Sequence, residues 1–415
     1  MITPRGALKV LRAEGFLGTR DRALDRLAEV RRRRSFRLDR AISAAHRTAT
    51  LELIATRPAP RLGGVQIRLL RRLEAEARQR PTALLYPEPG GYRLELAAPS
   101  GRRALAFAAR PLAPPPAVAD AGFEQAVLRA AATVGAGRLH VEGLAGLPPA
   151  SLLALHRQGL RLTVSLHDFA AFCPRPHLLE LPPLAFCRYS RDPERCARCL
   201  AHDWPVAPGW QETRRALAAE VLAAAEVVSY PSAFLRRQHL ELFPTLDPAR
   251  QQVVSPEPAA APAARPHAAH KTPLHVAYAG RVLPHKGALV FEEVVRRFAA
   301  AGGPGVRWSA YGGGDDDLLL RLRRLPGVRV RGSYRSGALP ELLAADRVDL
   351  ALLLSIVPES YGITLSECRA AGVPVLAYDL GALGERVRGS GDGHLVPLAA
   401  GAEGVAALLA RLVAA

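Results

Sequence analysis

Residues 348–380, VDLALLLSIVPESYGITLSECRAAGVPVLAYDL, decide the fold of this chain. Short apolar runs stand at both ends of the stretch, at 348–354 and 373–378, and each predicts a buried strand. A helical pattern lies between them. A strand, a helix and a second strand in this order form the repeating unit of a parallel sheet.

The helix within this stretch begins near Ile363 and is bounded by residues that suit its ends. Gly362 lets the backbone approach a ligand closely, and Gly372 and Pro374 end the helix as a C-cap glycine and a helix breaker. The N-terminus of a helix that opens beside the end of a strand is an anion site. The stretch therefore predicts a place where a diphosphate can bind.

The same alternation of strands and helices extends through most of the chain. We predict two groups of strands, at 51–56, 82–86, 138–142, 161–166, 226–230 and 251–254, and at 275–279, 306–311, 328–332, 348–354, 373–378 and 393–397. A β-hairpin at 92–109 is inserted in the first group. The pattern predicts an α/β protein with two Rossmann-like, doubly wound parallel sheets, whose ligands bind beyond the carboxyl ends of the strands.

Composition divides the chain into four parts. We predict a basic helical extension at 1–47, a first domain at 48–255 with a cysteine-containing insertion at 169–204, a linker at 256–273 and a second domain at 274–415. The extension has two interpretations. Its apolar residues, among them Leu24, Leu27 and Val30, either pack on the body of the protein or lie on an anionic bilayer.

The formal net charge is +18, and it comes almost wholly from arginine. A basic surface attracts phosphates, which can belong to nucleic acid, lipid headgroups or a phosphorylated substrate. No basic patch interleaved with aromatic residues is present, so we expect no nucleic-acid partner. No apolar stretch is long enough to span a membrane, and no signal-peptide core stands at the start, so we expect a cytoplasmic protein that can rest on the inner face of the membrane.

Two carboxylates flank the predicted anion site. Glu359 precedes the helix, and Glu367 lies about one turn inside it. A carboxylate can accept two hydrogen bonds from a vicinal diol, so the pair suits sugar hydroxyls. The alternative is two solvated glutamates that flank a helix.

These two glutamates, followed by Ala-Gly-Val-Pro-Val at 371–375, resemble the signature of family-4 (group 1) retaining glycosyltransferases of the GT-B fold. The resemblance implies two facing Rossmann-like domains with a cleft between them. It implies that Glu359 faces the transferred sugar and that Glu367 binds the ribose of the donor. It also implies that the backbone of residues 361–363, Tyr361, Gly362 and Ile363, meets sugar and phosphate.

A second element, at 278–287, again places a loop between a strand and a helix. Arg281 and Lys286 can neutralise a diphosphate, and the resemblance gives them the role of stabilising the leaving nucleotide, with Gly280 beside them. Taken alone, both would be ordinary surface residues. Gly312, after the next strand, is a further candidate for a backbone contact with the donor.

The first domain offers weaker candidates. Gly63 and Gly64 resemble the glycine-rich loop of the same family, which faces the donor across the cleft. His167 ends a strand, and the family often carries a His-Asp pair there beside sugar and acceptor. We expect Asp168 to orient His167 or to act as a cap, and His140 and Arg175 are secondary candidates for the cleft, although a lone histidine is usually structural.

Four of the five cysteines lie close together in the sequence, at Cys173, Cys187, Cys196 and Cys199. The closing Cys-x-x-Cys is a spacing that a structural zinc site uses. Free thiols and disulfides are the alternatives.

Together these features predict a retaining glycosyltransferase that moves a sugar from a nucleotide-diphosphate sugar to a glycan or lipid-linked acceptor, in bacterial envelope polysaccharide synthesis. The resemblance implies that catalysis requires no metal. The alternative is a non-catalytic GT-B protein that binds nucleotide-sugar or glycan.

Overall fold

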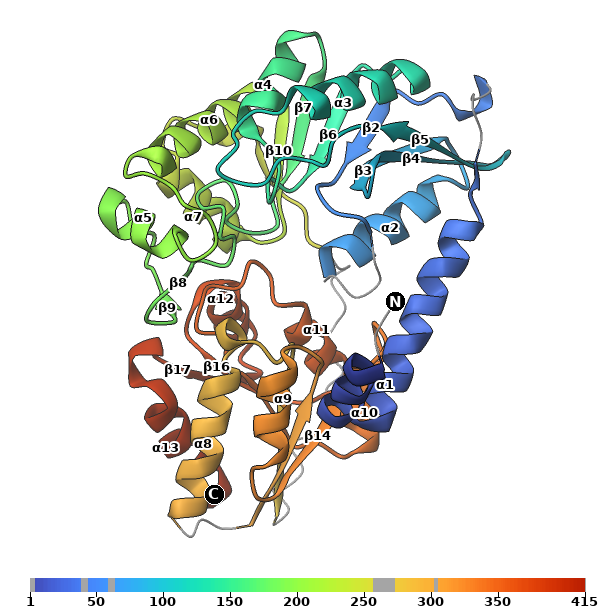
Figure 1. Cartoon of the computed structure of the whole chain (residues 1–415). Helices are drawn as coiled ribbons and strands as arrows, with labels where there is room; N and C mark the ends of the chain where they lie inside the picture. The colour runs from blue at the N-terminus through green and yellow to red at the C-terminus, as the bar shows by residue number, and fades with distance from the viewer. Residues whose placement is uncertain (1–3, 39–43, 59–63, 257–272, 302–304, 415) are drawn as a thin grey trace. The chain divides into compact units, whose positions relative to one another are not determined.

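The computed structural model describes residues 4–38, 44–58, 64–256, 273–301 and 305–414 (Figure 1). The chain forms two compact units. The N-terminal unit is Ala28–Pro256, and the C-terminal unit combines Met1–Leu27 with Glu257–Ala415. The first 27 residues therefore group with the C-terminal unit, whereas the sequence suggested one extension over residues 1–47. The predicted linker lies, except for its two end residues, outside the described residues.

The C-terminal unit contains a six-stranded sheet in which every pair of neighbouring strands is parallel. Its strands are β12 (Leu274–Ala279), β13 (Val306–Tyr311), β14 (Val328–Gly332), β15 (Leu350–Leu353), β16 (Val375–Tyr378) and β17 (Gly393–Val396). The spatial order β14-β13-β12-β15-β16-β17 is that of a Rossmann sheet. The order reverses between β12 and β15, so the loops after these two strands border the expected ligand crevice. All six predicted strands are confirmed.

Helices cover both faces of this sheet. They are α8 (Ala288–Ala300), α9 (Asp316–Arg323), α10 (Leu339–Ala345), α11 (Ile363–Ala370), α12 (Gly381–Ser390) and α13 (Gly401–Ala414). Alternate residues of β12 join different cores, because side chains of a strand alternate between faces. Val276 and Tyr278 pack in the cluster that includes Phe291, and Ala277 and Ala279 pack in the other. This two-sided burial explains the continuous apolar runs seen in the sequence.

The N-terminal unit contains a nine-stranded sheet in the order β1-β5-β4-β3-β2-β6-β7-β10-β11. Its strands are β1 (Arg37–Leu38), β2 (Thr50–Leu53), β3 (Thr82–Glu88), β4 (Gly91–Ala98), β5 (Gly101–Ala108), β6 (Arg138–Glu142), β7 (Arg161–Ser165), β10 (Val227–Tyr230) and β11 (Gln251–Val253). The antiparallel β4–β5 pair is the predicted hairpin, with β3 as its other neighbour. Strand β2 has β3 on one side and β6, which begins the rest of the parallel strands, on the other. The strand order therefore reverses between β2 and β6, which gives this unit its own switch point.

The helices of this unit alternate with its parallel strands, as the sequence predicted. They are α2 (Gly64–Glu76), α3 (Ala121–Val134), α4 (Pro149–Arg157), α5 (Pro193–Leu200), α6 (Trp210–Ala224) and α7 (Ala233–Leu242). Two short strands, β8 (Leu179–Glu180) and β9 (Ala185–Phe186), form a small separate sheet within the cysteine-containing insertion. None of the helices in the described part of the chain is both long and apolar enough to cross a membrane.

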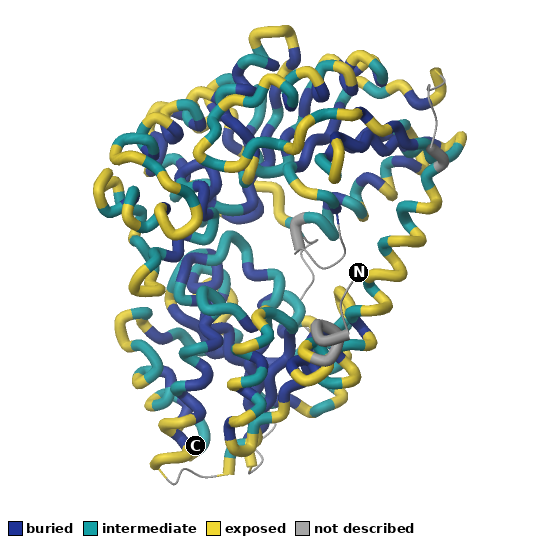
Figure 2. Tube along the Cα trace, viewed as in Figure 1, coloured by how far each residue is buried: buried dark blue, intermediate teal, exposed yellow. Residues whose placement is uncertain are grey.

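The first helix, α1 (Pro4–Arg34), is kinked at Gly15 and ends thirteen residues before the predicted limit of 47. Polar residues lie on its covered side, since Glu14 and Asp21 are buried and Asp21 pairs with Arg331 at 2.9 Å. Leu24, Leu27 and Val30 of the predicted apolar stripe are 42%, 53% and 42% exposed. Figure 2 shows exposed segments along much of α1. The helix is therefore packed on the C-terminal unit, but through Ala13, Glu14 and Asp21 and not through the apolar stripe.

Candidate functional site

The loop after β12 is fixed from beneath by a tyrosine of that strand. The hydroxyl of Tyr278 donates to the carbonyl oxygens of Arg281 at 2.7 Å and Lys286 at 3.1 Å. Tyr278 is fully buried, and burial together with the charge of Glu359 raises the pKa of its hydroxyl. The hydroxyl therefore stays protonated and acts as a donor. Sequence analysis assigned no role to this residue.

The loop after β12 packs backbone against backbone on the loop after β15. The N–H of Ile356 donates to the carbonyl of His285 at 3.0 Å, and the hydroxyl of Ser355 donates to the same oxygen at 3.2 Å. Gly287 has φ +81°, and a Cβ there would lie 1.8 Å from the carbonyl oxygen of Leu354. Only glycine fits so close a contact. The two predicted motifs thus meet at the switch point of the sheet.

Lys286 and Glu359 form an ion pair across these loops. The ammonium Nζ lies 2.5 Å from the carboxylate Oε1, and the two side chains are 30% and 18% exposed. Arg281 is exposed at the start of the same loop. The structure therefore places both predicted phosphate ligands and the predicted sugar ligand on two adjoining loops.

Helix α11 begins at the end of the second loop. Its N-cap is Gly362 (φ +82°), which has no side chain to cap the first N–H groups. Arg386 of α12 holds this turn, because its guanidinium donates to the carbonyls of Tyr361 at 2.9 Å and Gly362 at 3.0 Å and lies 3.9 Å from the ring centre of Tyr361. A helix start arranged in this way attracts anions. No spacing in the sequence points to Arg386, since it lies in the following helix.

Other predicted residues of the donor site have different surroundings. Glu367 lies inside α11, half-buried, and its charge contributes to raising the pKa of Tyr334, after the larger effect of burial. The N–H of Gly280 donates to the carbonyl of Tyr311 at 3.0 Å, and that of Gly312 donates to Gly332 at 3.1 Å. These two N–H groups hold loops together, so neither is available to a ligand in this arrangement.

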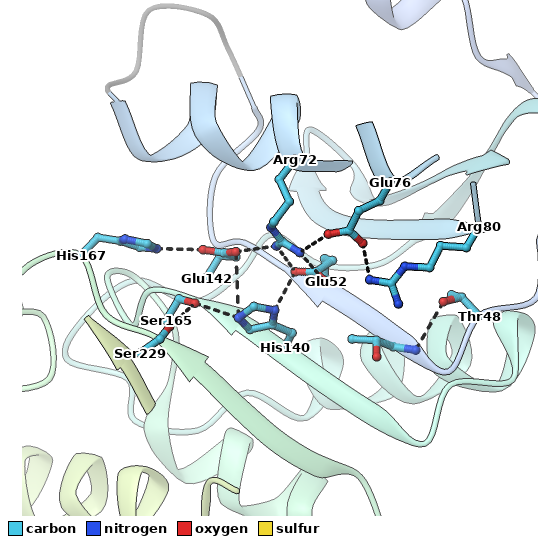
Figure 3. A network of polar contacts seen from close by, with 11 residues as sticks. Thr48, Glu52, Arg72, Glu76, Arg80, His140, Glu142, Ser165, His167 and Ser229 are labelled. Atoms are coloured by element: carbon cyan, nitrogen blue, oxygen red, sulfur yellow. Dashed lines mark hydrogen bonds and ion pairs between the residues drawn. The ribbon is translucent and has the colours of Figure 1, made fainter. Parts of the chain in front are cut away.

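In the N-terminal unit, His167 is held by a carboxylate that sequence analysis did not single out (Figure 3). Its Nε2 lies 2.8 Å from Oε2 of Glu142, and both residues are almost fully buried. Arg72 of α2 donates to Glu142 at 2.7 Å and to Glu52 at 2.8 Å. Glu52 is the penultimate residue of β2 and Glu142 is the last residue of β6, so this network lies at the switch point of the N-terminal sheet.

The network continues through His140. Its Nδ1 lies 3.1 Å from Oε2 of Glu52, and its Nε2 lies 2.8 Å from the hydroxyl of Ser165, which in turn contacts Ser229. Burial of the Glu142 carboxylate opposes ionisation, but the hydrogen bond and charge of His167, with His140 and Arg72, lower its pKa to about 2. Burial of His140 likewise opposes its charge, yet Glu52 and Glu142 raise the pKa of the imidazole.

Asp168 acts as a cap and does not orient His167. Its carboxylate accepts from the N–H of Ala170 at 2.8 Å, and burial raises its pKa. Arg175 is buried within the insertion, where it pairs with Asp203 at 2.6 Å. No contact joins Arg175 to His167 in the described part of the chain. Gly63 lies outside the described residues, and Gly64 is the first residue of α2.

Among the residues that the structure describes, one group of oxygen and nitrogen ligands could hold a metal ion. Ligand atoms of Glu52, His140 and Glu142 lie within 4.8 Å of one another. Arg72 already bridges the two carboxylates, so their negative charge is compensated without an ion.

The predicted zinc cysteines are not gathered as one zinc ion requires. Their sulfurs form no disulfide, and no three of the four lie within 4.8 Å of one another in the residues that were placed. Four sulfurs around one zinc ion stand about 3.8 Å apart, given Zn–S bonds of about 2.3 Å. The positions of the sulfurs in this structure therefore do not support one zinc ion bound by all four cysteines.

Comparison with known proteins identifies the C-terminal unit. Residues 273–415 match the family described as "Glycosyl transferases group 1". The D-inositol 3-phosphate glycosyltransferase of Rhodococcus erythropolis is 32% identical over 133 residues, which are 29% of each protein. The match thus spans less than a third of that relative's length.

Solved structures resemble most of the chain. Sucrose-phosphate synthase from Thermosynechococcus elongatus has a TM-score of 0.59 at 19% identity, over 88% of this chain and 90% of its own. HepE of Anabaena, in complex with UDP and glucose, has a TM-score of 0.54 at 15% identity, with the same coverage. The chain therefore has the GT-B fold, and its residues 273–415 form a group 1 glycosyltransferase domain, the domain of a transferase.

Proposed function

We propose that this protein is a retaining glycosyltransferase of family 4 that transfers a sugar from a nucleoside-diphosphate sugar to an acceptor. The observation that carries the proposal is the Lys286–Glu359 pair at the switch point of a Rossmann sheet. It joins a cation suited to phosphate and a carboxylate suited to sugar hydroxyls on two adjoining loops. The complexes of HepE with UDP and glucose support the same class of donor.

Three positive groups act on the donor diphosphate in this proposal. Lys286 exchanges its contact with Glu359 for a phosphate oxygen, and Arg281 and the N-terminus of α11 bind beside it. Glu359 then accepts hydrogen bonds from the transferred sugar, and Glu367 accepts them from the ribose. Charge that develops on the leaving diphosphate meets donors already in position, which is an effective form of catalysis.

His167 is the group of the N-terminal unit that we propose to act beside the sugar and the acceptor. Glu142, itself held by Arg72, fixes the ring of His167 through a hydrogen bond at Nε2. That edge of the imidazole therefore already contacts the protein. Lys286, Arg281 and the helix terminus supply the positive charge that a divalent metal supplies in other transferases. We therefore propose that transfer needs no metal ion.

For the acceptor we propose a glycan or a lipid-linked precursor in envelope polysaccharide synthesis, met at the inner face of the cytoplasmic membrane. The apolar residues exposed on α1, including Phe16 at 73%, together with the arginines of its last turn, support peripheral membrane association. Flotation with anionic vesicles tests this association. Phe16→Ser with Leu27→Ser should reduce binding, Val254→Ser is the control on another exposed apolar residue, and equal binding of all forms would refute the proposal.

A thermal-shift screen tests the donor site. UDP, GDP, ADP, dTDP and CMP are compared on the wild type and on Glu367→Ala, since a ligand bound only by the folded state raises its melting temperature. One diphosphate should stabilise the wild type and lose its effect in the variant. No shift with any nucleotide would contradict the proposal.

The alternative is a GT-B protein that binds nucleotide-sugar without turnover. Transfer assays with the nucleotide-sugar that the screen selects separate the two, because only an enzyme releases free nucleotide in proportion to glycosylated acceptor. The anomeric configuration of the product, read by NMR, decides between retention and inversion.

A further inference from the structure

The four cysteines of the insertion face one pocket. Cys173, Cys187, Cys196 and Cys199 all line one small cavity between the small β8–β9 sheet, α5 and α6. Thirteen, eight and two residues separate them along the chain, so only the fold brings them to the same cavity. The fifth cysteine, Cys368, is buried in α11 of the other unit.

Backbone N–H groups point at three of the sulfur atoms. Cys187 accepts from the N–H groups of Tyr189 and Ser190, and Cys173 accepts from that of Arg175. The N–H of Leu181 lies 3.5 Å from the sulfur of Cys199. Burial raises the pKa of the Cys173 and Cys187 thiols, and these hydrogen bonds oppose that effect because a negative sulfur is the better acceptor.

The backbone is strained where it makes these bonds. Arg188 and Tyr189 have φ of +52° and +58°, two successive residues with side chains in the left-handed region. Such conformations cost free energy and persist where the surrounding structure imposes them, often at ligand sites. Here the strained turn is the one that directs two N–H groups at the sulfur of Cys187.

The pocket also holds buried positive charge with unused hydrogen-bonding capacity. Arg215 is 6% exposed, its Nη2 lies 3.8 Å from the sulfur of Cys196, and its Nη1 has no hydrogen-bond partner. Its carboxylate neighbour, Glu212, is 3.9 Å away and 40% exposed. Arg175 Nε and Gln211 Oε1 are likewise buried without partners. Buried cations require a nearby negative charge. Asp203 supplies one to Arg175 at 2.6 Å, whereas the carboxylate nearest to Arg215 is that of Glu212 at 3.9 Å.

We propose that Cys173, Cys187, Cys196 and Cys199 form a tetrathiolate site for a metal centre. Four thiolates around a divalent metal, or around an iron–sulfur cluster, carry a net negative charge that satisfies the surrounding arginines. No three of the sulfurs lie within 4.8 Å of one another in the described chain, so a single ion would draw them closer together. A cluster would instead bind each thiolate through a different iron.

The centre would brace the loop that follows His167. Arg214 donates to the carbonyls of Ala170 at 2.6 Å and Ala171 at 3.4 Å, and Arg215 donates to Phe172 at 2.9 Å. Arg215 thus contacts both the cysteine pocket and the chain that runs from His167 to Cys173, and Arg214 holds the residues just before Phe172. The proposed metal site does not depend on the proposed sugar transfer. The experiment that tests it measures the metal content of the protein and not its transferase activity.

The experiment is metal and sulfide analysis of the full-length protein purified without oxygen. We expect a stoichiometric metal. About four equivalents each of iron and acid-labile sulfide, with a visible absorption band, would identify a [4Fe–4S] cluster. About one equivalent of zinc, with no sulfide, would instead identify a single ion drawn in by the same four thiolates. Folded protein without stoichiometric iron or zinc overturns the site.

Variants assign the metal to these residues. Cys173→Ser with Cys187→Ser should lose the metal, and Cys368→Ser is the matched control that should retain it. Glu52→Gln tests the other group of potential ligands and should also retain it. Metal retained by the double cysteine variant overturns the proposal. If that variant does not fold, metal analysis of the wild type still decides.

Discussion

The ammonium of Lys286 lies 2.5 Å from the carboxylate of Glu359, although the two residues are 73 positions apart in the sequence. The contact exists because β12 and β15 are neighbours in the sheet while β13 and β14 extend it on the other side. The loops that leave these two strands therefore meet. Their meeting makes the pair the natural centre for tests of the proposed function.

Replacing Lys286 with alanine should weaken binding of the nucleoside diphosphate about 10- to 100-fold. A hydrogen bond to a charged group contributes about 1.5–3 kcal/mol, and the variant also leaves Glu359 without its cation. Transfer should fall by about 10²–10³, because the lost donor acts on the developing charge. Calorimetry and steady-state kinetics measure the two effects. Lys286→Arg should restore part of both, and unchanged binding by Lys286→Ala would exclude Lys286 as a phosphate ligand.

Replacing Arg386 with alanine should raise KM for the donor about tenfold, because the carbonyls of Tyr361 and Gly362 lose the group that fixes the start of α11. The neighbouring Arg388 is the matched control. It lies in the same helix, is 61% exposed and pairs with Asp379, away from this turn. Kinetics of Arg386→Ala and Arg388→Ala should differ accordingly, and equal values would show that Arg386 does not position the site.

Stability should fall as the pH is lowered from about 4.5 to about 2, partly because of Glu142. Its pKa is about 2 in the folded protein and near 4.5 otherwise, so the folded state favours the ionised form. The stabilisation is present above pH 4.5 and is lost as pH falls through the folded pKa. Its size is on the order of 3 kcal/mol.

Glu142→Gln should lose this contribution at every pH. In urea denaturation, the free energy of unfolding of the variant should be well below that of the wild type at pH 7, and the difference should be smaller near pH 3. A difference that does not change with pH would show that the ionised state of Glu142 is not what stabilises the network.

Gly287→Ala should destabilise the protein by about 3 kcal/mol or more, since its Cβ would overlap the carbonyl oxygen of Leu354. Gly327→Ala is the control that measures the cost of the backbone conformation alone. Gly327 has a similar φ of +73° but open space around it, so its replacement should cost only about 1–2 kcal/mol. Thermal or urea denaturation measures both, and equal losses would mean that the contact between the loops adds nothing.

Much of the secondary structure of the C-terminal unit, which carries the proposed donor site, can be predicted from local sequence. Gly362 and Gly372 bound a helix between two apolar runs, and both strands and the helix are found where predicted. Apolar runs of this kind specify strands buried on both faces, and the alternation with helices specifies a parallel sheet. The motif around Glu359 and the loop of Lys286 could be located because both follow predicted strands.

The residues that support these motifs could not be found in this way. Arg386, Tyr278 and Glu142 act through contacts with distant segments, and nothing in their own surroundings in the sequence marks them. Glu142 was visible only as the last residue of a strand. Its partnership with His167 depends on the pairing of β6 with β7, and that with Arg72 on where α2 packs.

By itself, then, the sequence determined the strands, the helices between them and the two loops most suited to a nucleotide-sugar, because these depend on local periodicity and on residues at helix ends. Tertiary structure alone decided the rest. It directed the Leu24 face of α1 outward, gave His167 a glutamate in place of Asp168, and set the four cysteines around one cavity at a spacing wider than a zinc ion needs. The reason is that strand order and packing bring together groups whose separation along the chain carries no record of their meeting.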